Sequence, residues 1–138
     1  MFVLDTNVVS EMRRQQKMHP SVYAWAKGTP FPSMYLSAVT ILEIEMGVLR
    51  IERKDARQAA PLRWWLEQRV LKEFEGRILP FDATVARICA KMHVPDPKAE
   101  RDAMIAATAV AHGMIAVTRN VADFRAMGVK TLNPWMEH

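Results

Sequence analysis

The sequence predicts one α/β domain over residues 1–138, with a mainly parallel central sheet of about five strands and helices on both faces. Short apolar runs alternate with longer helical patterns along the whole chain, a rhythm typical of parallel strands joined by helices. Half of the residues are apolar, which suffices for one core in a chain of this length. In such folds, binding sites gather beyond the carboxyl ends of the strands.

The N-terminal part predicts a buried strand and two short helices. The apolar run Phe2–Leu4 stops at Asp5-Thr6-Asn7, where polar residues favour the start of a helix. We expect helices from about Val8 to Gln16 and from Val22 to Ala26, followed by a loop over residues 28–33 with two prolines. Asp5 then lies at the carboxyl end of the first strand.

The central part predicts two strands around a long helical region. Tyr35–Ser37 is the second expected strand, and Ser37 is placed to cap a helix that continues through Leu49. Apolar side chains recur every three or four residues over 55–74, which predicts an amphipathic helix. The third strand covers residues 77–81 at a sheet edge, because Pro80 cannot donate a hydrogen bond to the ladder.

The C-terminal part continues the alternation. Asp82 is expected to cap a helix over 83–92, in which Cys89 is a small core residue, and a second helix over 99–112 ends before Gly113. The fourth strand covers 114–118, a short helix ends at Gly128, and the last strand covers 129–132.

The charge of the chain fits a partner that bears phosphates. The formal net charge is +4 and the isoelectric point is near 9.5, and such a balance also serves as a solubilising surface. The first residues lack the pattern of a secretory signal, and no apolar run reaches 18 residues. We therefore expect a cytoplasmic protein without a membrane partner.

Carboxylates follow the expected strands or begin the expected helices. Asp5 lies after the first strand, where it can serve a catalytic site or cap the next helix. Glu43 has the apolar or small neighbours Val39, Met46 and Gly47 on its helix face, whereas Glu45 has an equally apolar set on the opposite face. Periodicity therefore leaves both glutamates open.

Two further acidic groups come from the C-terminal half. Asp102 precedes a run of small residues in the first turns of a helix, where Glu100 also lies, so either acid can complement the helix dipole. Thr118, Asn120 and Asp123 follow the fourth strand as a polar cluster. Separate strand ends and helix starts thus deliver carboxylates to one crevice.

An acidic site of this kind favours a hard divalent cation. Carboxylates held close together repel one another unless a cation neutralises them, and Mg²⁺ or Mn²⁺ takes oxygen ligands. The sequence carries no phosphate-binding glycine loop, G-x-S-x-G elbow or C-x-x-C pair. These absences exclude most nucleotide hydrolases and serine hydrolases.

The ordered motifs resemble those of PIN-domain ribonucleases, especially the VapC and FitB branch of toxin–antitoxin systems. The segments that carry the resemblance are Leu4 to Asn7, Ser37 to Gly47, Asp102 to Ala109 and Thr118 to Phe124. Residues 76–82 and the closing Asn133-Pro134-Trp135 also look FitB-like, so the resemblance covers essentially the whole chain. The glutamate of the family stands four residues before a glycine, which selects Glu43.

The resemblance implies a PIN-like α/β/α sandwich and a Mg²⁺-dependent endoribonuclease toxin, with Mn²⁺ as the second candidate metal. Asp5, Glu43 and Asp102 would coordinate or position the metal. The fourth group would be Asp123, which we favour, or Asn120. Thr118 and Asn120 would hydrogen-bond the ligands or the scissile phosphate.

The resemblance also implies partners. RNA is the expected substrate, and a VapB-like antitoxin would cover the acidic pocket and join the chain in a hetero-oligomer on operator DNA. The aromatic residues Tyr35, Trp64, Trp65 and Trp135 exceed the evident needs of the core, which favours a homodimer. Two alternatives are a non-catalytic PIN-like protein that binds RNA or a partner, and a haloacid-dehalogenase-like phosphatase with Asp5 as its nucleophile.

Overall fold

A five-stranded parallel sheet forms the centre of the molecule in the computed structural model, which describes residues 1–136. The strands are β1 (Phe2–Leu4), β2 (Met34–Ser37), β3 (Ile78–Leu79), β4 (Ile115–Val117) and β5 (Thr131–Leu132). Their order in the sheet is β3-β2-β1-β4-β5, and every neighbouring pair is parallel. The α/β fold expected from the sequence is confirmed, and β1 is its central strand.

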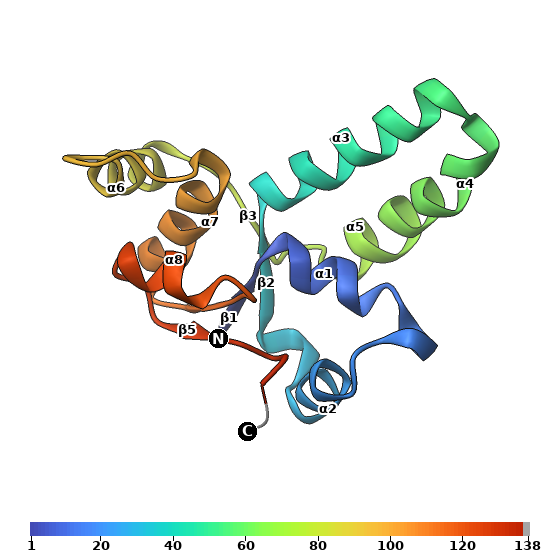
Figure 1. The fold of residues 1–138 in the computed structure, drawn as a ribbon, viewed down its shortest axis with the longest axis horizontal. Helices are drawn as coiled ribbons and strands as arrows, with labels where there is room; N and C mark the ends of the chain where they lie inside the picture. The colour runs from blue at the N-terminus through green and yellow to red at the C-terminus, as the bar shows by residue number, and fades with distance from the viewer. Residues whose placement is uncertain (137–138) are drawn as a thin grey trace.

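Helices cover both faces of the sheet, as expected for an α/β/α sandwich. Figure 1 shows α6 (Ala83–Met92), α7 (Glu100–Ala111) and α8 (Val121–Ala126) on one side. On the other side lie α1 (Thr6–Met12), α2 (Pro20–Gly28) and α5 (Leu71–Glu73), while α3 (Ala38–Lys54) and α4 (Ala56–Trp65) form a hairpin that projects from the body.

The side chains of each strand alternate between the two cores. On β1, Val3 packs in the cluster that contains Ile105 and Phe124, whereas Leu4 packs in the cluster that contains Val8 and Leu36. This alternation is the period of two that a strand imposes. Both layers are therefore anchored to the central strand, and the residue that follows it, Asp5, is fixed at the carboxyl edge of the sheet.

The helices of the N-terminal part differ from the expected bounds. Helix α1 starts at Thr6 because Asp5 caps it, and it ends at Met12. Gln15, whose φ angle is +34°, opens a 3₁₀ turn over Gln15–Lys17 instead of continuing the helix. Helix α2 is longer than expected because Pro20 fits the first helical position and His19 caps it. A second 3₁₀ turn, Phe31–Ser33, precedes β2.

The expected helix over residues 55–74 is divided into three pieces. Asp55 caps α4, a π-helical segment follows at Leu66–Val70, and α5 completes the run. Leu66, Val70 and Phe74 are all buried. In a regular α-helix of 3.6 residues per turn, side chains four residues apart point in directions that rotate progressively around the helix axis. A π turn contains more residues and reduces this rotation. The interruption thus keeps all three side chains in the core.

The C-terminal elements agree with the expectations within a residue or two at most ends. In the central part, Ser37 caps α3 as expected, but α3 continues past the expected Leu49 to Lys54, where Asp55 ends it. Asp82 caps α6, and β3 lies at the sheet edge just before Pro80. The two edge strands, β3 and β5, are only two residues long. Cys89 is buried, as expected.

Most of the aromatic residues that the sequence suggested for an interface are partly buried. Tyr35, Trp65 and Trp135 are partly buried and pack against the cores, whereas Trp64 on α4 is 58% exposed. In residues 1–136, no helix is both long and apolar enough to cross a membrane.

Candidate active site

Asp5 lies at the centre of the carboxyl edge and is held by two hydrogen bonds. Its Oδ1 accepts from the backbone N–H of Thr6 at 2.7 Å, and its Oδ2 accepts from the hydroxyl of Thr118 at 2.8 Å. Only 4% of Asp5 is exposed. Of the two roles that the sequence offered for this residue, the structure shows the helix cap: one oxygen caps α1 while the other accepts from Thr118 at the end of β4.

Glu43 reaches the same edge from the second turn of α3. Its Oε1 accepts a hydrogen bond from the Thr6 hydroxyl at 2.7 Å, and that hydroxyl also lies 3.1 Å from the hydroxyl of Thr40. Thr6 thus contacts Asp5 through its backbone and Glu43 through its side chain. Glu45 points elsewhere, because its Oε2 lies 2.6 Å from Nη1 of Arg63 on α4.

Asp102 and Asp123 approach from the first turns of α7 and α8. Asp102 is partly buried and Asp123 is exposed. The negative charges of Glu43 and Asp123 both contribute to a raised pKa of the Asp102 carboxyl, although burial is the largest cause. Asp102 is therefore close enough to be influenced by the charge of Glu43 on α3 and by that of Asp123 on α8.

Thr118 and Asn120 form the floor and one rim of the site. Thr118 is fully buried, donates to Asp5 and accepts a hydrogen bond from the backbone N–H of Asn120 at 3.0 Å. The Asn120 residue itself is exposed. The geometry brings the side chains of Thr118 and Asp123 toward the other acids, and Asn120 contributes its backbone to this arrangement.

The electrostatics of the cluster oppose ionisation of its central acid. Burial, together with the negative charges of Asp102 and Glu43, raises the pKa of Asp5 from 3.8 to about 6, and the hydrogen bonds from Thr118 and Thr6 limit the rise. Mutual repulsion of this kind is relieved when a cation lies among the carboxylates.

The donor set fits a hard divalent cation such as Mg²⁺. Four carboxylates face one edge of the sheet and repel one another, and oxygen ligands are those that Mg²⁺ prefers. Within residues 1–136, no three His, Cys, Asp or Glu side chains lie close enough together to form a ready-made metal site. The acids are thus near enough to influence each other but do not converge on one point.

Sequence reasoning did not identify Thr6, Thr40 or Arg101 as site residues. The Thr6 hydroxyl joins positions 37 residues apart in the chain, and Nη1 of Arg101 lies 4.0 Å from Oε2 of Glu43. Thr6 directly follows Asp5 and Arg101 directly precedes Asp102. Their position next to a candidate acid was the one feature of the sequence that could have identified these two residues.

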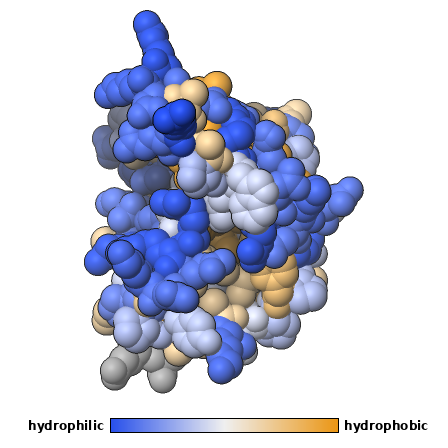
Figure 2. All heavy atoms as spheres, turned by 90° about the vertical axis from the view of Figure 1, so that its right-hand side faces the viewer, coloured by the Kyte–Doolittle hydropathy of each residue, from blue (hydrophilic) through white to orange (hydrophobic). Residues whose placement is uncertain are grey.

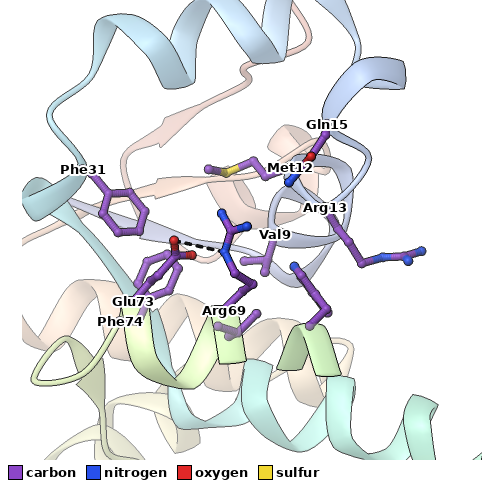
Figure 3. A pocket seen from close by; sticks show the side chains of 10 residues that line it. Val9, Met12, Arg13, Gln15, Phe31, Arg69, Glu73 and Phe74 are labelled. Carbon is purple, nitrogen blue, oxygen red and sulfur yellow. Dashed lines mark ion pairs between the residues drawn. The ribbon is translucent and has the colours of Figure 1, made fainter. Parts of the chain in front are cut away.

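A separate pocket of about 280 Å³ lies beside α1, and no candidate acid lines it. Val9 and Met12 of α1 and its C-cap residue Arg13 form one side, and Phe31 and Phe74 form a wall opposite (Figure 3). Arg69 crosses the pocket and pairs with Glu73 at 3.2 Å. The face that carries the α3–α4 hairpin is mostly hydrophilic but is hollowed near its middle, where apolar residues are visible (Figure 2).

Comparisons with known proteins agree with this architecture. The model of the PIN domain matches residues 2–130. The toxin FitB of Neisseria gonorrhoeae is 40% identical over 141 residues, and the alignment covers 98% of this chain and 99% of FitB. The VapC ribonuclease Y4jK of Sinorhizobium fredii is 36% identical over 140 residues, with 98% of each chain covered.

A solved structure gives the same result. A chain in the structure of FitAB bound to an IR36 DNA fragment superposes with a TM-score of 0.89 at 38% identity, covering 100% of this chain and 99% of that one. The family match spans most of the sequence, and both relatives align over nearly their full lengths. This chain therefore belongs to the PIN-domain family, in its VapC/FitB-like branch.

Proposed function

We propose that this protein is a Mg²⁺-dependent endoribonuclease toxin, with Mn²⁺ as an alternative metal, and that a VapB-like antitoxin neutralises it. The observation that carries the proposal is the buried carboxylate of Asp5, surrounded by the charges of Glu43 and Asp102 at the end of the central strand. The names of the related ribonuclease and toxin support the same activity.

The residues that would hold the metal are Asp5, Glu43, Asp102 and Asp123. When bound, the metal would supply an activated water and would stabilise negative charge on the phosphate and the departing oxygen. Thr118 and Thr6 orient the carboxylates through the hydrogen bonds described above. Asp123 is favoured over Asn120 as the fourth ligand, because its charge already acts on Asp102.

Arg119 is placed to hold the RNA backbone beside the acids. It is exposed and lies between Thr118 and Asn120, and its guanidinium carbon is 5.0 Å from the centre of the Trp135 ring. Stacking on an aromatic ring restricts the side chain while leaving its charge available to a phosphate. Single-stranded RNA, whose phosphates and bases are accessible, fits such an open site.

The antitoxin would cover the acids and then follow α1 to the neighbouring pocket. Thr6 at the start of α1 contacts Glu43, and Val9, Met12 and Arg13 further along the helix line the pocket. A helix of seven residues is about 10 Å long, so a short peptide segment can span both features. The aliphatic and aromatic residues of the lining suit an apolar anchor beside the Arg69–Glu73 pair, and Arg13 at the rim suits acidic neighbours on that segment.

A homodimer remains part of the proposal. Leu42 and Leu49 on α3 are 48% and 53% exposed, and Trp64 on α4 is more exposed still. Apolar side chains on a projecting hairpin favour association of two copies. With the antitoxin, such a dimer would form a hetero-oligomer able to bind operator DNA through the antitoxin, the arrangement that the FitAB–DNA complex suggests.

The first test is RNA cleavage by the purified chain freed of antitoxin. Total RNA is incubated with Mg²⁺ or Mn²⁺, with and without EDTA, and new RNA ends are mapped. We expect discrete cleavage that EDTA abolishes and that Asp5→Asn or Asp102→Asn lowers by about 100-fold or more. Asp96→Asn, which changes an exposed acid in a loop, is the matched control and should retain full activity.

Two outcomes would contradict the proposal. Unfolding of the Asp5 and Asp102 variants would assign these acids a structural role. RNA binding by the folded protein, without cleavage and insensitive to metal, would favour the non-catalytic alternative. The alternative hypothesis of a haloacid-dehalogenase-like phosphatase is no longer favoured, because the PIN-domain match spans residues 2–130.

A further inference from the structure

Arg101 is a cation at the edge of the acidic cluster. It precedes Asp102 in the first turn of α7, and its Nη1 lies 4.0 Å from Oε2 of Glu43. The other oxygen of Glu43 accepts the hydrogen bond from Thr6. Glu43 therefore lies between a neutral donor that fixes it and a positive charge from a different helix.

The contact between Arg101 and Glu43 is loose. The other arginine–carboxylate pairs in residues 1–136 have distances between 2.6 and 3.3 Å. The Arg101 side chain is 44% exposed and that of Glu43 is 26% exposed. A long, solvent-accessible pair contributes little to stability and is exchanged at low cost, so the guanidinium can leave Glu43 when a stronger cation arrives.

We infer that Arg101 is a built-in counter-ion that competes with the divalent metal for the acidic cluster. The inference rests on the proposed metal-dependent function and adds a residue that sets how much metal the site requires. Without metal, Arg101 offsets part of the negative charge of Glu43 and its neighbours. When metal binds, that attraction is replaced by repulsion between the arginine and the ion, which lowers metal affinity.

The size of the effect follows from Coulomb's law. A divalent ion held by Glu43 would lie near the Arg101 charge, because the guanidinium is already 4.0 Å from a Glu43 oxygen, and the repulsion between the two cations is reduced by solvent and salt. Removing the charge of Arg101 should therefore tighten metal binding about three- to tenfold. The chain that keeps Arg101 reaches half-occupancy only at a higher metal concentration, so its activity requires more metal.

The test is calorimetric titration of Mn²⁺ into the EDTA-treated, desalted full chain, without RNA. Arg101→Gln should bind Mn²⁺ about three- to tenfold more tightly than the wild type, and Arg101→Lys, which keeps the charge, should bind like the wild type. Arg53→Gln is the matched control: it removes the same charge from α3, about 15 Å along the helix axis from Glu43, and should leave the affinity unchanged.

Thermal unfolding provides a second readout that does not depend on activity. In EDTA, Arg101→Gln should unfold about 2 °C below the wild type, because the acids lose their counter-ion, and saturating Mn²⁺ should close or reverse this gap. Equal Mn²⁺ affinity in Arg101→Gln and the wild type would overturn the inference while leaving the metal site intact. Failure of every variant and of the wild type to bind Mn²⁺ would overturn both the inference and the proposed metal dependence.

Discussion

At the scale of single residues, Asp5 is the point where stability and chemistry conflict. Its two oxygens accept hydrogen bonds from Thr6 and Thr118, which favour the ionised form, while its burial and the nearby acids oppose that form more strongly. Carboxylates that are held close together despite their mutual repulsion favour the binding of a cation. Without the cation, this repulsion lowers the free energy of unfolding.

The pH dependence of stability tests this conflict. The pKa of Asp5 is about 6 in the folded chain and 3.8 for an unperturbed carboxyl, so the native state binds more protons than the unfolded state between these values. The contribution of Asp5 to the free energy of unfolding therefore falls as pH rises from about 4 to 6. In EDTA at pH 7, Asp5→Asn should be more stable than the wild type, by about 3 kcal/mol at most.

Urea unfolding in EDTA at several pH values measures this difference. The advantage of Asp5→Asn should shrink toward pH 4, where the native carboxyl is protonated, and saturating Mg²⁺ should stabilise the wild type but not the variant. A wild type that gains stability relative to Asp5→Asn between pH 4 and 6 would show that hydrogen bonding to the ionised form dominates over burial.

Individual site residues differed in how well the sequence could predict them. Asp5 was predictable because an apolar strand ends directly before it. Helical periodicity left Glu43 and Glu45 equivalent, and the glutamate-to-glycine spacing of the family selected Glu43. In the structure, the contacts with Thr6 and Arg63 separate the two glutamates. The role of Arg101 depends on the approach of α7 to α3, which no local pattern encodes.

At the scale of elements, Arg77 ties three segments together beside β3. Its guanidinium donates to the carbonyl oxygens of Phe31, Met34 and Glu73. Its Cζ also lies 4.6 Å from the centre of the Phe31 ring and 5.0 Å from that of Phe74, and these two rings pack against each other with their centres 5.0 Å apart. The turn before β2 and the end of α5 are thereby fixed to the edge strand.

Loss of this side chain should weaken the whole edge of the sheet. We expect Arg77→Ala to lower the free energy of unfolding by about 2 kcal/mol, because several carbonyl groups lose a charged donor. Arg77→Lys should recover less than half of this loss, since an ammonium group cannot span the same acceptors. Urea unfolding in EDTA measures both. Arg87→Ala, a change at an exposed position of α6, is the control, and equal stability of Arg77→Ala and this control would contradict the role.

Elements bounded by chemical signals were predicted well, and those shaped by packing were not. Ser37 and Asp82 marked the starts of α3 and α6 because their side chains accept backbone N–H groups there. The π-helical segment at Leu66–Val70 has no such signal, since it results from burying residues four apart. The early end of α1 depends on the backbone of Gln15, a residue that rarely adopts a positive φ angle.

At the scale of the whole molecule, α1 connects the acidic edge with the pocket. The helix follows its cap residue Asp5, and Met12 in its last turn and Arg13, which caps its end, line the pocket. An antitoxin that follows this helix would block the acids and anchor itself at a distance from them. Part of the binding free energy of the antitoxin would then come from contacts with the pocket, which the cleavage reaction does not use. An antitoxin could therefore bind tightly without resembling RNA.

Reversing the charge at the pocket rim tests this arrangement. Arg13 is exposed and its guanidinium carbon lies 5.7 Å from the centre of the Trp65 ring. Arg13→Glu should weaken binding of the proposed antitoxin by about tenfold or more, because acidic groups of the antitoxin would meet a like charge. Calorimetry of the purified pair gives the affinity, and native mass measurement of the co-expressed complex gives the number of copies of each chain.

Arg87→Glu makes the same change on α6, on the opposite side of the sheet (Figure 1), and should bind like the wild type. If both variants bind the antitoxin equally well, the antitoxin reaches the acids by a path that does not include the pocket.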